Sequence, residues 1–272
     1  MSAENLHVGV IGATGAVGVE LINVMFDRKF PVGELTLFAS ERSAGKTVET
    51  KFGTKTVALF SVEEAKQCDI VFLAVSGDFA KEYAPKIAEG ALVIDNSSAF
   101  RLNDDVPLIV PEINGDLAKT AKLIANPNCT TMAAMPVLKA LHAEAGLERL
   151  IVSTYQAVSG SGLAGAQELL GQIEGVLSQG DTLRLVHDGS AVDFPQPEKY
   201  VAPIAFDVIP LAGSVVDDGL NETDEEKKLR NESRKILELP DLRVAGTCVR
   251  VPVFTGHSLS INAEFARDIT PE

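Results

Sequence analysis

The first half of the chain alternates short, β-rich apolar runs with helix-like segments, and this alternation limits the folds available to it. The apolar runs are "HVGVIG", "ELTLFAS", "DIVFLAVS", "ALVIDNSS" and "KLIANP". Segments 15–27 and 79–88, which lie between runs, have helical patterns. Strands that alternate with helices in this way typically form a parallel sheet with helices on both of its faces. We therefore predict an α/β domain built from βαβ units.

The second half has a different character. A helical pattern runs through "TMAAMPVLKALHAEAG", interrupted by Pro136 and ended by Gly146. Longer strands follow in "LERLIVSTYQAVS" and "LRVAGTCVRVPVF", with helices near 163–178 and 223–237. Strands of this length indicate an open mixed sheet that carries helices, which is an α+β domain. Two domains also suit a chain of 272 residues, and we predict them over residues 1–132 and 133–272.

Composition excludes several classes of partner. A net charge of −14 and a pI near 4.8 argue against nucleic acid or an anionic membrane as the partner, because a negative field repels phosphates. No apolar run approaches the roughly 20 residues of a membrane span, and the start has no secretory pattern. Three cysteines form neither a disulfide framework nor a metal-type pair. We expect free thiols, no metal site and a cytoplasmic protein.

A glycine-rich segment, "GATGAVG", follows the first predicted strand and opens a helix. Gly12, Gly15 and Gly18 are spaced three apart. Glycines in such a turn let the backbone approach a pyrophosphate, which the helix N-terminus then receives. The segment therefore predicts a dinucleotide site, although a glycine-rich turn without a ligand is the alternative.

The end of the second predicted strand indicates which dinucleotide binds. An NAD site usually has a carboxylate there for the ribose 2′-hydroxyl. The segment "ASERSAGK" instead offers Ser40, Arg42, Ser43 and Lys46, which suit a 2′-phosphate. We therefore favour NADP, while Glu41 leaves an NAD site open.

Cys129 lies between the run "KLIAN" and the helical pattern that follows it, so we expect its sulfur at a helix N-terminus. That position lowers the pKa of a thiol and makes the thiolate available as a nucleophile. The alternative is a buried, inert thiol, which we prefer for Cys68 and Cys248.

A thiolate beside a nicotinamide indicates the oxidation of an aldehyde through a thiohemiacetal to a thioester. This chemistry needs an acid/base group. His257, in "FTGHSLS", follows a strand and has small neighbours that permit close approach of a substrate. We choose His257 among the four histidines, with a structural or solvent-exposed histidine as the alternative.

The motifs together resemble one family. "GATGAVG", "SERSAGK", "DNSSAFR", "VPEIN", "NPNCTT", "QAVSGSG", "NETDEEKK" and "CVRVPVFTGHS" occur in the order and spacing of aspartate-β-semialdehyde dehydrogenases. The resemblance extends over essentially the whole chain and implies a Rossmann-type cofactor domain followed by a catalytic and dimerisation domain. It also implies NADP-dependent, reversible reduction of L-aspartyl-4-phosphate to L-aspartate β-semialdehyde and phosphate. The implied pathway is that of lysine, diaminopimelate, threonine and methionine, and the implied assembly is a homodimer.

The resemblance also implies residue roles. Cys129 corresponds to the thioester-forming nucleophile, His257 to the acid/base residue and Gln156 to the substrate-orienting residue. Arg250 and Glu225 correspond to the groups that bind the substrate carboxylate and amine. The phosphate contacts correspond to Arg101, Asn128 and Lys228, and the cofactor contacts to Gly12, Thr14, Gly15, Ala16, Val17, Gly18, Ser40, Arg42, Ser43, Ser159 and Gly160.

Some of these residues also have a simpler structural interpretation. Glu225 and Lys228, three apart on a helix, could form only an ion pair. Arg250 could be a surface charge on a strand, although an unpaired cation between valines would be costly. Ser159 and Gly160 could belong to a flexible turn.

The sequence departs from the family pattern at its end, because family members continue beyond the point that corresponds to Glu272. Their further segment returns to the cofactor domain, so the resemblance predicts a C-terminally shortened chain. N-acetyl-γ-glutamyl-phosphate reductase is a related alternative, against which Glu225 and "NPNCTT" argue. A non-catalytic dinucleotide-binding or assembly protein is the alternative from another class.

Overall fold

The computed structural model describes residues 5–270, and this part of the chain divides into two compact units. The first unit contains the described residues up to Lys139 together with Glu232–Pro240. The second contains Ala140–Asn231 and the described residues from Asp241 onward. Two helices, α5 (Cys129–Ala145) and α7 (Asp224–Leu237), contribute residues to both units. The sequence placed one boundary at residue 132 and did not anticipate the return of a segment of α7 to the first unit.

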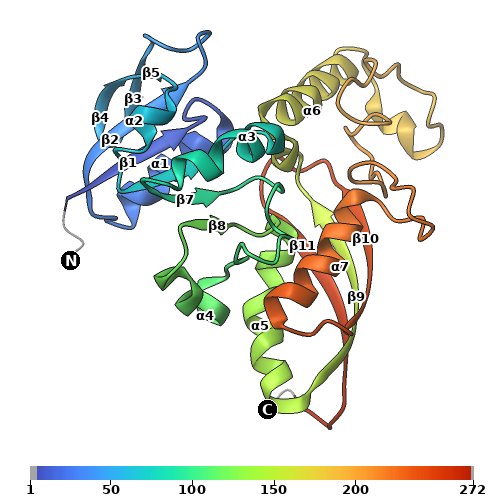
Figure 1. Ribbon diagram of the computed structural model, residues 1–272. Coiled ribbons are helices and arrows are strands. Elements are labelled where there is room, and N and C mark those ends of the chain that lie inside the picture. The colour runs from blue at the N-terminus through green and yellow to red at the C-terminus, as the bar shows by residue number, and fades with distance from the viewer. Residues whose placement is uncertain (1–4, 271–272) are drawn as a thin grey trace. The chain divides into compact units, whose positions relative to one another are not determined.

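The first unit contains a six-stranded sheet in the order β5-β2-β1-β6-β7-β8 (Figure 1). All of its neighbouring strands are parallel. The strands are β1 (Leu6–Ile11), β2 (Val32–Ala39), β5 (Ala58–Leu59), β6 (Ile70–Leu73), β7 (Leu92–Asp95) and β8 (Leu123–Ala125). This sheet confirms the predicted α/β fold. From β1 the chain adds β2 and β5 on one side and then β6, β7 and β8 on the other. The strand order therefore changes direction at β1, the strand that leads into α1.

Helices and one small hairpin connect these strands. The helices are α1 (Ala16–Asp27), α2 (Val62–Ala65), α3 (Gly77–Ile87) and α4 (Pro111–Asn114), followed by a 3₁₀ helix, η1 (Gly115–Lys119). The hairpin pairs β3 (Thr47–Thr50) with β4 (Gly53–Thr56). The sequence analysis missed this hairpin because "TVET" and "GTKT" carry one apolar residue between them and give almost no hydrophobic alternation.

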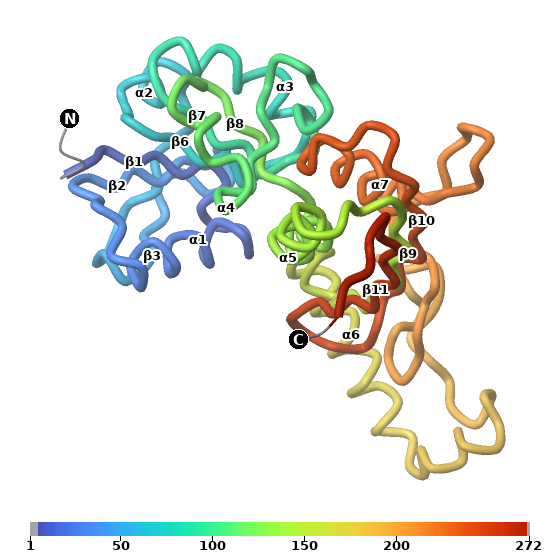
Figure 2. Tube along the Cα trace, turned by 90° about the horizontal axis from the view of Figure 1, so that it is seen from below, coloured from blue at the N-terminus to red at the C-terminus, as the bar shows by residue number. Residues whose placement is uncertain are grey.

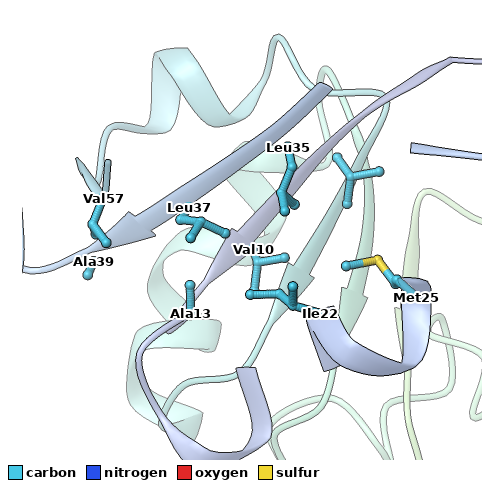
Figure 3. Close-up of a cluster of buried hydrophobic side chains, with 9 residues drawn as sticks. Val10, Ala13, Ile22, Met25, Leu35, Leu37, Ala39 and Val57 are labelled. Carbon is cyan, nitrogen blue, oxygen red and sulfur yellow. The ribbon is translucent and has the colours of Figure 1, made fainter. Parts of the chain in front are cut away.

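One cluster of buried side chains fixes α1 against the sheet (Figure 3). Val10, Leu35 and Leu37 come from β1 and β2, and Ile22 and Met25 come from α1. Each fully buried side chain of this kind stabilises the fold by roughly 1.5–3 kcal/mol. The packing therefore sets where the N-terminus of α1 lies relative to the ends of β1 and β2.

The second unit contains a three-stranded sheet in the order β10-β9-β11. β9 (Leu147–Gln156) pairs in parallel with β10 (Arg243–Arg250) and antiparallel with β11 (Ser258–Phe265). The sheet is therefore mixed, as predicted. Helix α7 covers one of its faces, since a Cβ added to Gly246 would lie 2.8 Å from the side chain of Leu229.

A long segment follows the sheet's central strand in the second unit. It contains the 3₁₀ helices η2 (Val158–Ser161) and η3 (Thr182–Val186) with α6 (Gly162–Leu177) between them. In Figure 2 the yellow-to-orange part of this segment projects away from the strands. The buried side chain of Gln172, on α6, anchors the later part of this segment. The Oε1 atom of Gln172 accepts hydrogen bonds from the main-chain N–H groups of Ile204 at 2.8 Å and Ala205 at 3.0 Å.

Helix α5 continues through Pro136, where the sequence predicted an interruption. Proline removes one backbone hydrogen bond from a helix interior. Met135 and Leu138 beside it are buried, and this packing holds the helix together until Gly146, whose φ of +73° ends it as predicted. Within residues 5–270, no helix combines the length and the apolar character that crossing a membrane requires.

Candidate active site

The glycine-rich segment forms a tight turn that only glycine can make. Gly12 has a φ of +85°, and a Cβ there would lie 2.3 Å from the carbonyl oxygen of Ala74. A Cβ on Gly18 would lie 2.4 Å from the carbonyl oxygen of Gly12. The turn therefore brings the end of β1, the neighbouring strand end and the first turn of α1 to within contact distance of one another.

The N-terminus of α1 is open to a ligand. Its N-cap residue is Gly15, and no side chain caps the helix. The first backbone N–H groups of a helix have no intrahelical acceptor, and together they form the positive end of the helix dipole. This end of α1 can therefore receive a phosphate group, as the sequence predicted.

A pocket of about 400 Å³ lies beside this turn in the first unit. It is lined by five of the predicted cofactor residues, namely Gly12, Thr14, Ser40, Arg42 and Ser43. Gly15, Ala16, Val17 and Gly18 belong to the adjoining turn and helix and are not among its lining residues. Glu41 also lines the pocket, so the carboxylate that left an NAD site open lies at the same site as Arg42, which favoured NADP.

Aromatic walls of this pocket were not predicted. Phe60 and Phe79 line it, and their ring centroids are 4.9 Å apart. Phe60 follows β5 and Phe79 lies in the first turn of α3. Both residues look like ordinary core positions in the sequence, and only the fold brings them beside Arg42. Flat apolar walls next to polar groups are typical of sites that bind an aromatic base.

Cys129 is the first residue of α5 and is exposed, as the sequence predicted for a thiol at a helix N-terminus. Asn128 caps this helix. Its side-chain Oδ1 accepts hydrogen bonds from the main chain of Thr130 at 3.0 Å and Thr131 at 3.4 Å, and from the Thr130 hydroxyl at 2.6 Å. Both threonine side chains are buried, so the cap holds the turn rigidly while the thiol remains accessible.

The other two cysteines are in a different state. Cys68 and Cys248 are both buried. Burial raises the pKa of Cys68 to about 11 and that of Cys248 to about 12. Both thiols are therefore protonated near neutral pH, and their burial agrees with the buried thiols that the sequence predicted.

A buried carboxylate lies next to the predicted phosphate contacts in the first unit. Glu232 accepts hydrogen bonds from Nη1 of Arg101 at 3.0 Å and from the main-chain N–H of Asn128 at 2.6 Å. Nη2 of Arg101 also donates to the carbonyl oxygen of Asn96 at 3.1 Å. The sequence analysis missed Glu232, since a glutamate in a charged helical segment usually faces solvent.

The predicted substrate groups of the second unit form a chain of hydrogen bonds. Gln156 ends β9, and its Nε2 donates to Oε1 of Glu225 at 3.1 Å. Oε2 of Glu225 accepts a hydrogen bond from Lys228 at 3.2 Å, and Lys228 also donates to Asp224 at 2.6 Å. Burial alone would lower the pKa of Lys228, but its hydrogen bond to Asp224 and the charge of Glu225 raise it overall. Lys228 is therefore a cation in this network.

Local sequence explains why α7 presents these groups. The Thr223 hydroxyl caps the helix by accepting a hydrogen bond from the main-chain N–H of Glu226, and the Glu226 carboxylate accepts one from the main-chain N–H of Thr223 at 2.8 Å. This reciprocal arrangement is a capping box, which fixes where the helix begins. Glu225 is buried, although the acidic stretch around it reads as a solvated loop and helix start. The ion pair between Glu225 and Lys228 that the sequence left open as an alternative is present.

Arg250 and His257 both lie against Gly160. A Cβ on Gly160 would be 2.8 Å from Nη1 of Arg250 and 3.3 Å from the ring of His257. Arg250 is buried at the end of β10, and its Nη1 donates to the carbonyl oxygen of Ala157 at 3.1 Å. Arg250 is therefore not the surface charge that the sequence left as an alternative, and Gly160 allows the side chains of Arg250 and His257 to approach the same point.

The ring of His257 is held in one orientation. Its Nδ1 accepts a hydrogen bond from the main-chain N–H of Ala157 at 3.0 Å. The neutral ring therefore carries its proton on Nε2, and a second proton on Nδ1 would break this bond. Burial lowers the pKa of His257, and the positive charge of Arg250 lowers it further. The ring is thus a neutral imidazole at neutral pH, suited to acid/base work.

A second pocket, of about 380 Å³, brings four predicted residues together. Gly160, Glu225, Lys228 and Arg250 all line it. Its walls include further residues that the sequence analysis did not single out, among them Lys199, Tyr200 and Asp224. Ser159 is not among its lining residues. Opposite charges within one small pocket suit a ligand that carries both an amine and a carboxylate.

The predicted residues thus fall into two groups that the structure describes separately. Cys129, Asn128, Arg101 and the glycine-turn residues belong to the first unit. Gln156, Glu225, Lys228, Arg250 and His257 belong to the second, as do Ser159 and Gly160. Each group forms a coherent site within its own unit.

Comparisons with known proteins agree on the family. A family model described as "Semialdehyde dehydrogenase, NAD binding domain" matches residues 7–121. A second, described as "Semialdehyde dehydrogenase, dimerisation domain", matches residues 138–272. The first match covers the chain from β1 to β7, and the second covers all three strands of the mixed sheet.

Individual relatives match over nearly the whole chain. The aspartate-semialdehyde dehydrogenase of Streptomyces akiyoshiensis is 58% identical over 98% of this chain and 78% of that protein. Aspartate semialdehyde dehydrogenase II of Vibrio cholerae, solved as a complex with ASA, has a TM-score of 0.86 and 39% identity, covering 98% of this chain and 76% of that one. The enzyme of Candida albicans, solved with NADP, has a TM-score of 0.66 and 25% identity over 98% of this chain and 74% of that one.

Proposed function

Because the chain belongs to the aspartate-semialdehyde dehydrogenase family, we propose that Cys129 forms the covalent intermediate and that the two pockets bind its two reactants. The chain is an oxidoreductase with a dinucleotide-binding domain, and its reaction interconverts L-aspartate β-semialdehyde plus phosphate with L-aspartyl-4-phosphate. The observation that carries the proposal for Cys129 is its exposure at the capped start of α5, whereas the other two thiols are buried and protonated.

In the oxidative direction, the thiolate of Cys129 adds to the aldehyde carbon to give a thiohemiacetal. Loss of a hydride and a proton from this adduct leaves a thioester on Cys129. The dinucleotide, when bound, accepts the hydride. An oxygen of phosphate then attacks the thioester carbonyl, expels the Cys129 thiolate and gives the acyl phosphate. The reverse sequence is the reductive dephosphorylation.

His257 is the proposed acid/base residue. Its lowered pKa keeps the imidazole neutral at the pH of the cell, and with Nδ1 accepting from Ala157 the ring offers Nε2–H as a donor. A proton leaves the thiol before addition and the thiohemiacetal hydroxyl during oxidation, and we assign both transfers to His257. To accept either proton at Nε2, the ring takes the tautomer with its proton on Nδ1, which breaks the hydrogen bond from Ala157.

The remaining charges are assigned to binding. Arg250 offers a guanidinium fork to the substrate α-carboxylate, and Glu225 offers a carboxylate to the α-amine. Gln156 touches Glu225 and is assigned to orienting the substrate. Lys228, Arg101 and Asn128 are the proposed phosphate contacts.

We propose NADP as the preferred dinucleotide. Ser40, Arg42 and Ser43 line the same pocket as the glycine turn and supply donors for a 2′-phosphate. Phe60 and Phe79 offer apolar walls for the adenine. The main chain at Thr14 to Val17 is assigned to the pyrophosphate, and Ser159 and Gly160 are kept as proposed cofactor contacts. The carboxylate of Glu41 would repel a 2′-phosphate, whereas Arg42 would attract it. The ratio of NADP to NAD affinity therefore measures which of these two residues has the larger effect.

We also propose a homodimer that forms through the open face of the three-stranded sheet. Ile151 and Tyr155 are exposed on β9, on the face opposite to the buried Val152 and Thr154. Ala245 and Val249 of β10 lie beside them in register. Exposed apolar side chains on a sheet face, in a segment that matches a dimerisation domain, suit a second copy of the chain. Light scattering should give twice the chain mass for the wild type and the mass of one chain for Ile151→Asp.

The proposed setting is a reducing cytoplasm, in the pathway that leads to lysine, diaminopimelate, threonine and methionine. The deciding assay is formation of reduced dinucleotide after L-aspartate β-semialdehyde is added to the purified chain. We expect continuous turnover that requires phosphate and is faster with NADP than with NAD; without phosphate, at most one equivalent of reduced dinucleotide per chain should form. Continuous turnover without phosphate would contradict the thioester route, and faster turnover with NAD would contradict the cofactor assignment.

A further inference from the structure

Glu232 is a buried carboxylate for which the proposed reaction has no role so far. Its side chain is 1% exposed, and it lies on α7 in the part of that helix that belongs to the first unit. Its two oxygens take two different partners, Arg101 at Oε1 and the main-chain N–H of Asn128 at Oε2. A carboxylate removed from water is tolerated only when both of its oxygens are satisfied in this way.

The first partner, Arg101, is held from two directions. Nη1 donates to Glu232 and Nη2 donates to the carbonyl oxygen of Asn96. Its Nε is buried and has no hydrogen-bond partner among the residues that the structure describes. A guanidinium has five N–H bonds, so a fixed Arg101 still has donors to offer. A buried donor without a partner requires an explanation, and an oxyanion ligand that rearranges the site supplies one.

The second partner, Asn128, is also held from two directions. Glu232 fixes its main-chain nitrogen, and its side chain caps the first turn of α5 through Thr130 and Thr131. The next residue is the exposed Cys129. Through its two oxygens, Glu232 therefore links a buried cation to the backbone immediately before the proposed nucleophile.

We propose that Glu232 is a positioning residue for phosphate. It holds the Arg101 guanidinium and the start of α5 as one preorganised unit, so that an incoming tetrahedral oxyanion meets donors that are already in place. This inference rests on the proposed function, which assigns Arg101 and Asn128 to phosphate.

The charge of Glu232 indicates that it acts indirectly. A carboxylate repels phosphate and would not contact it. Its contribution is to prevent the flexible Arg101 side chain from adopting other rotamers, which reduces the entropy lost when the oxyanion binds. A residue with this role affects phosphate use more than it affects aldehyde or dinucleotide use.

The first test is Glu232→Asp, which keeps the negative charge but shortens the side chain by one methylene. Aspartate cannot reach both partners from the same backbone position. We expect the KM for phosphate to rise roughly tenfold, because one hydrogen bond to a charged group is lost. The KM values for aldehyde and dinucleotide should change less than about twofold. Arsenate, which has the same shape and charge, should show the same change as phosphate.

Glu232→Gln is the second variant, and Glu238→Gln, at an exposed position just beyond the end of α7, is its matched control. The glutamine amide would direct an N–H group at a donor, either Arg101 or the main chain of Asn128. We expect a larger rise in the KM for phosphate than in Glu232→Asp and no change in Glu238→Gln. If Glu232→Gln does not fold, the Asp variant, in which the charge of Arg101 stays compensated, decides the matter.

An unchanged KM for phosphate in Glu232→Asp would overturn the proposal. The proposal would also be overturned if the apparent kcat fell only in proportion to the loss of folded protein while every KM stayed the same. If the wild type has no phosphate-dependent turnover, the proposed function fails instead. The positioning role of Glu232 is then tested without turnover, by measuring how far phosphate raises the midpoint temperature of thermal unfolding. A rise in the wild type that is absent in Glu232→Asp supports positioning, and no difference between the two overturns it.

Discussion

The two pockets of this protein are formed by different kinds of chemical group. The pocket in the first unit is shaped by backbone turns and apolar walls, with Gly12 at one side and Phe60 and Phe79 at another. The pocket in the second unit is shaped by charged side chains that bind one another, including Glu225, Lys228 and Arg250. The first therefore depends on main-chain shape and the second on a balance of charge, and the two should respond differently to substitution.

The largest expected effect separates binding from chemistry. We expect Cys129→Ser to lower turnover by a factor on the order of 10⁴ or more, because it removes the proposed nucleophile. Both pockets should still bind their ligands, since neither is lined by Cys129. Steady-state assays with dinucleotide binding by fluorescence check this. Cys68→Ala is the matched control, and activity retained in Cys129→Ser would remove the central role of this thiol.

A substitution in the charged pocket should have the next largest effect. Arg250→Lys keeps the charge but loses the guanidinium fork and its hydrogen bond to the carbonyl oxygen of Ala157. We expect kcat/KM for the aldehyde to fall about 100-fold, the equivalent of about 3 kcal/mol. The KM for the dinucleotide should change little. An equal loss for both reactants would show that the two pockets are not independent.

A substitution in the backbone-built pocket should act through shape alone. Gly12→Ala places a Cβ 2.3 Å from the carbonyl oxygen of Ala74 at a φ of +85°. Gly45→Ala has a similar φ of +80° but no atom within 4 Å, so it carries the backbone strain without the collision. We expect Gly12→Ala to lower the free energy of unfolding by about 2 kcal/mol more than Gly45→Ala does. Urea unfolding measures both, and equal losses would contradict the close approach of the two chain segments.

The smallest expected effect is a pH dependence from His257, whose ring lies against Gly160 of the charged pocket. The folded state lowers the pKa of His257, so the unfolded chain binds more protons once the pH falls below the ordinary histidine value of about 6.5. The stability that His257 contributes is therefore complete above that pH and decreases as the pH falls through it. We expect His257→Gln to flatten this part of the stability profile, measured by urea unfolding, whereas exposed His187→Gln should leave it unchanged. The same slope in both variants would assign the effect to other groups.

Most of the fold could be predicted because its signals are local. The alternation of apolar runs and helical segments predicted the parallel sheet, and long strands predicted the mixed one. The β3-β4 hairpin could not be predicted, since its stability comes from neighbours rather than from its own pattern. The helix through Pro136 was wrongly predicted to be interrupted because the packing of Met135 and Leu138, a tertiary effect, outweighs the local cost of proline.

The site was predictable in proportion to how local it is. The glycine turn and Cys129 are short motifs with physical consequences of their own. Arg250, Glu225 and Lys228 came from the resemblance, since they lie far apart along the chain and their partners cannot be read from spacing. Glu232 and Phe79 gave no usable signal, because burial of a helical glutamate and the position of an aromatic wall are decided only by the fold.

The contrast among the three thiols also makes the protein its own reporter. With Cys68 and Cys248 protonated and buried, a thiol-specific dye added near neutral pH should be consumed at one equivalent per chain. Dye uptake then counts the chains whose Cys129 is intact, which on the proposed role of this thiol are the chains able to turn over, and an oxidant that modifies Cys129 lowers both numbers together. The equivalents of dye consumed per chain thus give the fraction of a preparation in which this thiol was intact at the start.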